Sequence, residues 1–281
     1  MRDRLIYGTL ITVSVVALFW LDHAIGEVAI GSVSISGVVI FALTLLMMPI
    51  ASRELRGMAA AKSIDISAAI ISIAAWLVLL LFVHPAGPDG RLLAALIWGV
   101  LTAALIWAIR KGQVTGAIAS VSVTLTAVIY LGVLGGFYLL MRQEWPAWIV
   151  VAAILTVKCG DIGAYFTGRA IGKRKLIPFL SPGKTWEGLF GGIALAAIAA
   201  ACFTAFANSK GVMSVNPIYA AIGGGILAIV GHAGDLTISL FKRDAQIKDS
   251  GKLIPGSGGI LDILDSPLFA APVAYGLLCL A

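Results

Sequence analysis

Two aspartates, Asp262 and Asp265, stand three residues apart where an apolar run resumes near the end of the chain. On a helix, residues at i and i+3 share a face, so the two carboxylates would lie close together. Close carboxylates repel each other unless a cation intervenes, and magnesium takes oxygen ligands and commonly joins carboxylates to phosphates. We therefore predict a magnesium site, with Asp235 as the partner from another helix. Asp161 and Asp249 are candidates for ligands of a second ion, or for residues that support the ligands of the first.

A glycine-rich turn over residues 255–259 leads directly into the segment that carries these two aspartates. Glycine lets backbone N–H groups approach an anion, and a helix N-terminus favours negative charge, so the turn predicts a phosphate contact. A plain re-entrant turn is the alternative, just as helix capping is the alternative role for Asp265. Basic residues that could neutralise phosphates lie just upstream, at Lys242, Arg243 and Lys248.

A second group of polar residues lies earlier in the chain. Lys158 and Asp161 are three apart inside an apolar segment, which suits either a neutralising ion pair or a substrate contact. Ser181 followed by proline predicts the start of a helix, with Lys184 and Thr185 in its first turn, where a lysine can meet a phosphate. The Gly-Lys-Thr sequence lacks the earlier glycine of a Walker A loop at the required spacing, so we expect no P-loop.

The rest of the chain is overwhelmingly apolar. Its 281 residues are 60% hydrophobic and 12% charged, whereas a soluble domain carries about twice that charged fraction. The chain is therefore expected to be an integral membrane protein whose helices position the polar residues. Its 3 cysteines lie in apolar segments without a CxxC pattern, which argues against a disulfide framework.

Nine apolar segments are long enough, or nearly so, to cross a bilayer. We therefore predict an all-α fold, a polytopic bundle of about nine transmembrane helices. The fifth segment is long and contains three glycines, which predicts a tilt or a kink. The segments run over roughly 5–21, 28–50, 65–83, 92–109, 114–141, 147–168, 187–207, 217–241 and 260–280.

The basic residues predict which side each loop faces. With the N-terminus in the cytoplasm, sixteen of the twenty basic residues fall in inner loops, as the positive-inside rule expects. The same orientation puts Asp161, Asp235, Asp262 and Asp265 near the inner ends of their segments. Four carboxylates at one depth beside basic loops are typical of a site. We expect a transmembrane scaffold over residues 1–141 and a catalytic region over 142–281, with cytoplasmic loops at 169–186 and 242–259.

These residues together resemble the bacterial CDP-diacylglycerol synthases, also called phosphatidate cytidylyltransferases. The family motif runs S-x-x-K-R-x4-K-D-x-G-x3-P-G-H-G-G-x2-D-R-x-D. The chain departs from it at Ser257 and Ile263, where the family usually has His and Arg. The resemblance covers roughly residues 145 to 281 and extends upstream through the Ser-Pro-x-Lys-Thr-Trp-Glu-Gly sequence at 181–188. The matching motif positions are Ser239, Lys242, Arg243, Lys248, Asp249, Gly251, Pro255, Gly256, Gly258, Gly259, Asp262 and Asp265.

The resemblance implies an enzyme that transfers CMP from CTP to phosphatidate, giving CDP-diacylglycerol and pyrophosphate for phospholipid biosynthesis. It implies a multi-pass protein of the plasma membrane, or of the inner membrane of a cell with two, whose active site faces the cytoplasm. CTP, phosphatidate and membrane lipid would be the partners, with no nucleic acid, and a homodimer is left open. Mg²⁺ would be the cofactor, and a second cation is left open.

The resemblance also assigns roles to residues. Catalysis would rest on Asp235, Asp262, Lys184, Lys242 and Arg243. Substrate would be bound by Lys158, Asp161, Ser181, Thr185, Lys248, Asp249, Gly256, Ser257, Gly258 and Gly259. The metal ligands would come from Asp235, Asp262, Asp265 and Asp161.

Two other functions fit part of the pattern. Lys158, Asp161 and Asp235 inside apolar segments would suit an ion-coupled transporter, but such sites favour the bilayer midplane and internally repeated halves, and no internal repeat is seen. Another membrane nucleotidyltransferase or phosphotransferase, acting on a different lipid phosphate, would need the same kinds of residue. A panel of nucleotides and lipid phosphates separates that enzyme from the main interpretation.

Overall fold

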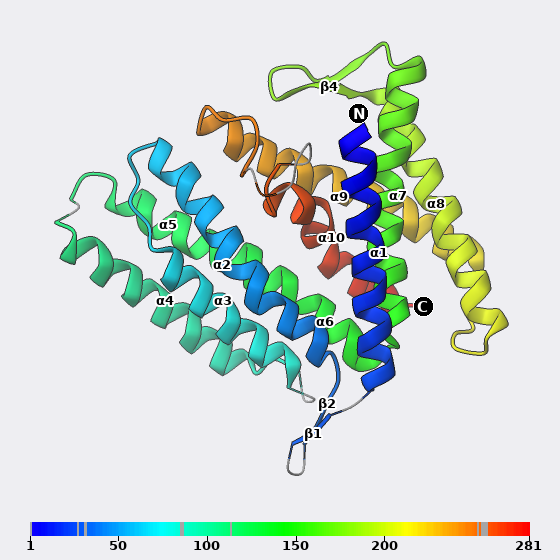
Figure 1. Cartoon of the computed structure of the whole chain (residues 1–281), viewed down its shortest axis with the longest axis horizontal. Helices are drawn as coiled ribbons and strands as arrows, with labels where there is room; N and C mark the ends of the chain where they lie inside the picture. Colours follow the sequence, from blue (N-terminus) through cyan, green and yellow to red (C-terminus); the bar gives the residue numbers. More distant parts are fainter. Residues whose placement is uncertain are drawn as a thin grey trace. The chain divides into compact units, whose positions relative to one another are not determined.

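The structure is a computed structural model that describes residues 2–26, 28–30, 33–84, 87–112, 114–251, 253 and 258–281. The described residues are mainly helical, and the short strands form two hairpins (Figure 1). The elements are α1 (Arg2–Ile25), β1 (Val28–Ile30), β2 (Val33–Ile35), α2 (Val38–Ala61), α3 (Ala68–Val83), α4 (Gly90–Arg110), α5 (Ala117–Val128), the π-helical turn η1 (Ile129–Val133), α6 (Leu134–Glu144), α7 (Ala147–Ile171), β3 (Lys175–Ile177), β4 (Ser181–Thr185), α8 (Trp186–Ser209), α9 (Pro217–Asp244) and α10 (Leu261–Cys279).

The predicted all-α membrane fold is confirmed. In the described part of the chain, 7 helices are long and apolar enough to cross a bilayer, with α5, η1 and α6 counting as one helix over Ala117–Glu144. The apolar stretch Val16–Ile25 of α1 and the helix α3 are shorter. Together these helices correspond to the nine predicted apolar segments.

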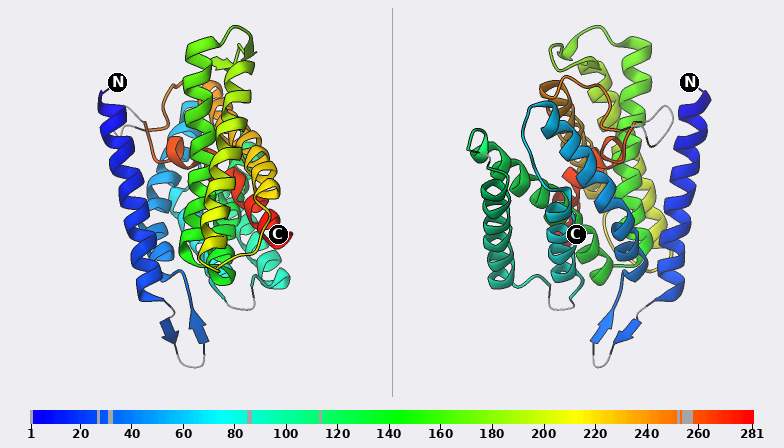
Figure 2. Two further views of the ribbon diagram at one scale, coloured as in Figure 1. Left: turned by 90° about the vertical axis from the view of Figure 1, so that its right-hand side faces the viewer. Right: turned by 60° about the vertical axis from the view of Figure 1, so that its left-hand side comes forward.

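The second predicted segment, 28–50, is wrong in its bounds. The antiparallel hairpin β1–β2 occupies its first residues, and α2 begins only after Gly37, whose φ of 81° is left-handed. The hairpin projects beyond the ends of α1 and α2 (Figure 2). Residues 28–35 alternate apolar with small or polar side chains around Gly-Ser, which is a strand pattern rather than a helical one. The shift extends α2 to Ala61, so Arg53, Glu54 and Arg56 lie on a helix instead of in a loop.

The fifth predicted segment, expected to tilt or kink, contains the single π-helical turn η1 between α5 and α6. Its glycines let this helix approach α3 closely. A Cβ added to Gly132 would lie 3.1 Å from the Cα of Ala75, and one added to Gly136 would lie 2.5 Å from the ring of Phe82. The glycines therefore serve close helix packing, as small residues commonly do between membrane helices.

The chain divides into two compact units. Unit 1 comprises residues 1–148 and 241–263, and unit 2 comprises residues 149–240 and 264–281. The helices α9 and α10 each contribute residues to both units. Each unit contains its own group of polar side chains.

A buried ion pair joins three helices of unit 1. Arg142 on α6 donates through Nε to Asp22 on α1 at 2.5 Å, and the two side chains are 9% and 2% exposed. The second carboxylate oxygen of Asp22 accepts the backbone N–H of Val39, at the start of α2, at 3.0 Å. Each charge is thus paired and hydrogen-bonded, which is the condition for burying it.

Removing one partner of this pair is expected to destabilise the protein strongly. Arg142→Ala would leave the Asp22 carboxylate buried without its cation, which costs about 3–5 kcal/mol of unfolding free energy. The measurement is denaturant unfolding in detergent micelles. Lys62→Ala is the matched control, because Lys62 pairs with Asp244 at 3.0 Å where the side chains are 43% and 63% exposed, and such pairs contribute about 0–1 kcal/mol. Equal stability of the two variants would contradict the prediction.

Candidate active site

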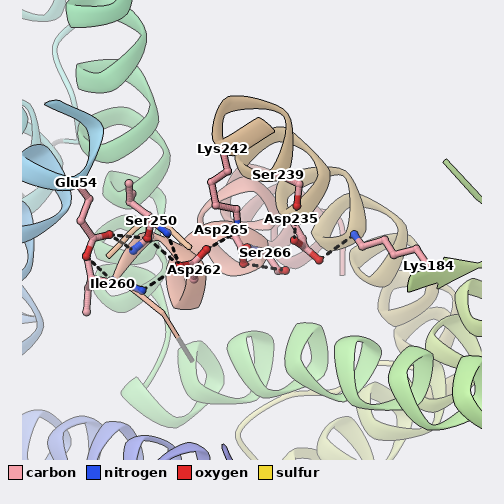
Figure 3. A network of polar contacts seen from close by, with 12 residues as sticks. Glu54, Lys184, Asp235, Ser239, Lys242, Ser250, Ile260, Asp262, Asp265 and Ser266 are labelled. Atoms are coloured by element: carbon pink, nitrogen blue, oxygen red, sulfur yellow. Dashed lines mark hydrogen bonds and ion pairs between the residues drawn. The ribbon is translucent and has the colours of Figure 1, made fainter. Parts of the chain in front are cut away.

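In unit 1, polar groups converge on Asp262, in the first turn of α10 (Figure 3). Its Oδ1 pairs with the Nζ of Lys242, in the last turn of α9, at 2.5 Å. Its Oδ2 accepts the backbone N–H and the hydroxyl of Ser250 and the backbone N–H of Gly259, each at 2.9 Å. The side chains of Lys242 and Asp262 are only 13% and 9% exposed. Asp262 is therefore an ionised group held in place by charge-assisted hydrogen bonds.

Glu54, on α2, belongs to the same cluster. Its carboxylate accepts the N–H groups of Ile260 and Leu261 at 2.8 and 3.0 Å, and its Oε2 lies 2.8 Å from the hydroxyl oxygen of Ser250. We call Glu54, Lys242, Ser250, Gly259 and Asp262 the Asp262 network.

The described end of the glycine-rich turn, Gly258 and Gly259, lies against this network. Gly258 has a φ of 89°, a left-handed conformation that glycine adopts without strain. A Cβ at Gly258 would collide with the carboxylate of Asp262, so the backbone passes directly against that side chain. In the structure the N–H of Gly259 donates to Asp262, and the phosphate contact of this turn stays a prediction. Gly256 and Ser257 lie outside the described residues.

In unit 2, a second group of polar side chains lies around Asp235 on α9 (Figure 3). The Nζ of Lys184, on β4, lies 2.8 Å from Asp235 Oδ2 and also donates to the backbone carbonyl of His232 at 3.4 Å. The Ser239 hydroxyl donates to Asp235 Oδ1 at 3.3 Å. Lys184 is 15% exposed and Asp235 is 35% exposed, so this carboxylate is less enclosed by protein atoms than the lysine.

The remaining polar side chains of unit 2 come from α7 and α10. Lys158 and Asp161 form an ion pair at 3.1 Å, one of the two roles expected for them. The Ser266 hydroxyl lies 3.4 Å from Asp161 and 3.2 Å from Asp265. Asp265 is buried, and its nearby charges are Asp235, Lys158 and Asp161. We call Lys158, Asp161, Lys184, Asp235, Asp265 and Ser266 the Asp235 network.

Small residues allow the helices of unit 2 to bring these groups together. A Cβ at Gly234 would lie 2.5 Å from the backbone oxygen of Asp265, and one at Gly231 would lie 2.8 Å from the side chain of Val157. A Cβ at Gly160 would lie 3.1 Å from that of Ala228. Because α9 lies this close to α7 and α10, the aspartates on the three helices can share one polar region.

The Asp235 network fits a cation by its charge and its donor atoms. Its three carboxyl groups outnumber its two ammonium groups. Carboxylate oxygens are the ligands that magnesium prefers. In the residues that the structure describes, no three His, Cys, Asp or Glu side chains are already arranged to hold an ion. Asp161, Asp235 and Asp262 instead pair with lysines.

The predicted helix start at Ser181 is wrong. Ser181–Thr185 is the strand β4, paired with β3, and α8 begins at Trp186. Thr185 is the N-cap, and its hydroxyl accepts the N–H of Gly188 at 3.1 Å. The hairpin forms in place of an earlier helix start because Glu187 accepts the backbone N–H groups of Lys173 and Arg174. These hydrogen bonds fold the segment before α8 back onto the start of that helix. Lys184 therefore reaches Asp235 from a strand.

Three further sequence-predicted site residues lie on the surface. Arg243, Lys248 and Asp249 are exposed, at and beyond the end of α9. Sequence reasoning missed Glu54, Ser250 and Ser266. Glu54 could have been noticed as a carboxylate near the inner end of an apolar helix. The predicted segment ended at residue 50, whereas α2 continues to Ala61, so Glu54 was taken for a loop residue.

Comparison with known proteins places the chain among cytidylyltransferases. A model of the "Cytidylyltransferase family" matches residues 4–281. A phosphatidate cytidylyltransferase of Staphylococcus epidermidis is 32% identical over 242 residues, which are 84% of this chain and 88% of the relative. Phosphatidate cytidylyltransferases of Pseudomonas aeruginosa and Bacillus subtilis are 41% and 39% identical over 50% and 56% of this chain. The matched region spans 51% and 58% of those two relatives, little more than half of their length.

Proposed function

The chain belongs to the cytidylyltransferase family, and from that premise we propose that it transfers CMP from CTP to phosphatidate. The products would be CDP-diacylglycerol, which stays in the membrane, and pyrophosphate. The observation that carries the proposal is the family match over residues 4–281, which includes every residue of the Asp262 and Asp235 networks.

The proposed reaction needs charge neutralisation more than it needs a base. A phosphatidate oxygen attacks the α-phosphorus of CTP in line, and the bond from that phosphorus to the oxygen leading to the β-phosphate breaks as pyrophosphate leaves. The attacking phosphate is already anionic near neutral pH, so no side chain has to remove a proton. The nucleophile is the lipid itself, which is consistent with the absence of a Ser/His pair from the proposed residues.

Lys184 and Lys242 would supply part of that neutralisation. Each is mostly buried and lies within 3 Å of a carboxylate, so each is held in one place before substrate arrives. A lysine ammonium in such surroundings stabilises negative charge that develops on phosphate oxygens. Arg243 and Lys248, which are exposed, would attract the triphosphate from solution.

Magnesium is part of the proposal. Asp235 and Asp262 are each proposed as metal ligands, and Asp265 or Asp161 would be a further ligand beside Asp235. The three carboxyl groups of the Asp235 network, against two ammonium groups, support the assignment within that network. When bound, magnesium would neutralise the triphosphate and polarise the phosphorus that is attacked.

The protein is a multi-pass membrane protein, and we place the proposed active site on the cytoplasmic side. Phosphatidate carries two acyl chains, so it must enter from the bilayer, whereas CTP must enter from water. The basic residues that dominate the predicted inner loops support the cytoplasmic side.

A substrate panel tests the proposed function. Purified protein is assayed with phosphatidate or polyprenyl phosphate as acceptor and with CTP, UTP, GTP or ATP as donor. The expected result is a nucleotide-linked lipid from CTP and phosphatidate only. A product from polyprenyl phosphate alone would instead identify a different lipid nucleotidyltransferase.

Lys184→Ala is expected to raise the KM for CTP by about tenfold or more, because a charge-assisted hydrogen bond to phosphate contributes about 1.5–3 kcal/mol. Initial rates over a CTP titration measure it. Lys210→Ala is the matched control: Lys210 follows the end of α8 and lies over the ring of Phe206 at 5.6 Å. If both variants had the wild-type KM, Lys184 would have no role in binding CTP.

A further inference from the structure

We propose that Glu54 is a positioning residue, which holds the start of α10 so that Asp262 keeps the conformation needed for catalysis. This inference rests on the proposed function. Glu54 lies on α2, far from the family motif in sequence, and it does not need to touch either substrate to act in this way.

The contacts of Glu54 with α10 are those of a helix-capping anion. The first N–H groups of a helix lack partners within the helix, and a negative charge is favoured there. Glu54 Oε1 accepts the N–H of Ile260 at 2.8 Å, and Oε2 accepts the N–H of Leu261 at 3.0 Å (Figure 3). Both amides directly precede Asp262 in the chain, so Glu54 determines where the backbone of that aspartate lies.

Ser250 connects Glu54 to Asp262. Its hydroxyl lies 2.8 Å from Glu54 Oε2 and 2.9 Å from Asp262 Oδ2. A hydroxyl has one hydrogen, so it can donate to only one of the two carboxylates at a time. The backbone N–H of Ser250 donates to Asp262 as well. A displacement of Glu54 would therefore move Asp262 in two ways, through the backbone at the start of α10 and through the hydrogen bonds of Ser250.

Two glycines make room for the Glu54 carboxylate. A Cβ at Gly251 would lie 2.6 Å from Glu54 Oε1, and a Cβ at Gly259 would collide with both Glu54 oxygens and with the Ser250 hydroxyl. The carboxylate is thus enclosed by backbone on two sides. Glutamine has the same shape but would present an NH₂ group to at least one of the three donors, and aspartate is one methylene too short to reach α10.

The test compares Glu54→Gln with Asp244→Asn. Asp244 is the matched control, because its carboxylate also receives a group from the end of α2, the Nζ of Lys62, but at an exposed site outside the Asp262 network. For Glu54→Gln, the magnesium concentration at half-maximal activity is expected to rise by about tenfold or more, as it does when a partner of a metal-ligating group is lost. The KM for phosphatidate is expected to stay near the wild-type value. Asp244→Asn should match wild type throughout.

Hydrogen exchange gives a readout that does not depend on activity. Amides in a peptide covering residues 258–263 should exchange faster in Glu54→Gln than in wild type or Asp244→Asn. Unchanged exchange in this peptide, or reduced activity with an unchanged magnesium requirement, would overturn the inference. If wild type itself made no CDP-diacylglycerol, the proposed function would fail, and the exchange measurement would still report whether Glu54 holds α10.

Ser250→Ala is the milder second variant, for use if Glu54→Gln does not fold. It removes the shared hydroxyl and keeps both hydrogen bonds from the backbone N–H groups of Ile260 and Leu261 to Glu54. A smaller rise in the magnesium requirement is expected than for Glu54→Gln. A wild-type magnesium requirement in Ser250→Ala would contradict coupling through this hydroxyl.

Discussion

Asp262→Asn is expected to lower CMP transfer by about 10²–10³-fold or more, the size of effect seen when a preorganised charge-stabilising group is lost. One oxygen of the carboxylate pairs with the ammonium group of Lys242. The other oxygen accepts hydrogen bonds from three donors on Ser250 and Gly259. Asparagine has one oxygen and an NH₂ group, so it can satisfy only one side. It also lacks the charge that Lys242 and magnesium require.

Initial rates at saturating CTP and phosphatidate measure this loss. Asp89→Asn is the control for removing a carboxylate, because Asp89 caps α4 and accepts the N–H of Arg91 at 2.7 Å, and asparagine caps helices about as well as aspartate. Near wild-type turnover by folded Asp262→Asn would remove Asp262 from the catalytic residues.

Asp235→Asn is expected to have an effect of similar size, about 10²–10³-fold on turnover. It would leave Lys184 without its carboxylate, and the Asp235 network would then hold two carboxylates against two ammonium groups. The surplus of carboxyl groups that favours a cation would be gone. Ser239→Ala is the matched control, since it removes only the 3.3 Å hydrogen bond to Asp235 and should cost less than about tenfold.

Metal substitution separates a magnesium ligand from a merely electrostatic role for Asp235. In Asp235→Cys, a thiolate replaces the carboxylate, and thiolates bind soft metals such as cadmium better than magnesium. Recovery of activity with cadmium is expected in this variant. Asp235→Ala, which offers no ligand, should recover nothing. Equal behaviour of the Cys and Ala variants would argue against direct ligation.

The helices could be predicted from sequence because hydropathy alone reports them. Long apolar runs such as those of α4 and α8 have one stable arrangement in a bilayer, since every backbone group must be satisfied within the helix. The bounds of α2 could not be obtained in this way. Residues 28–35 are apolar enough to be counted as the first part of a membrane-spanning segment. The hairpin is indicated by the two-residue period of their side chains and not by their hydropathy.

The contacts of the candidate site could be predicted only between residues that are close together in the sequence. Lys158 and Asp161 pair because residues at i and i+3 share a helix face. The contacts of Glu54 with Ser250 and Ile260 join residues about two hundred positions apart, and no local pattern reports such a contact. Lys184 was expected in a helix, because Ser-Pro is a common helix start. It lies on β4, and the pairing of β4 with β3 is not visible in the sequence of one strand.

The measurement that tests the central claim most directly follows the phosphates of CTP. Purified protein in phosphatidate-containing vesicles is given CTP labelled in the α-phosphate or in the γ-phosphate, with and without magnesium. The expected result is α-label in the lipid, γ-label in pyrophosphate, and neither without magnesium. Label from the γ-phosphate in the lipid, or no labelled lipid from either substrate with folded protein, would contradict CMP transfer.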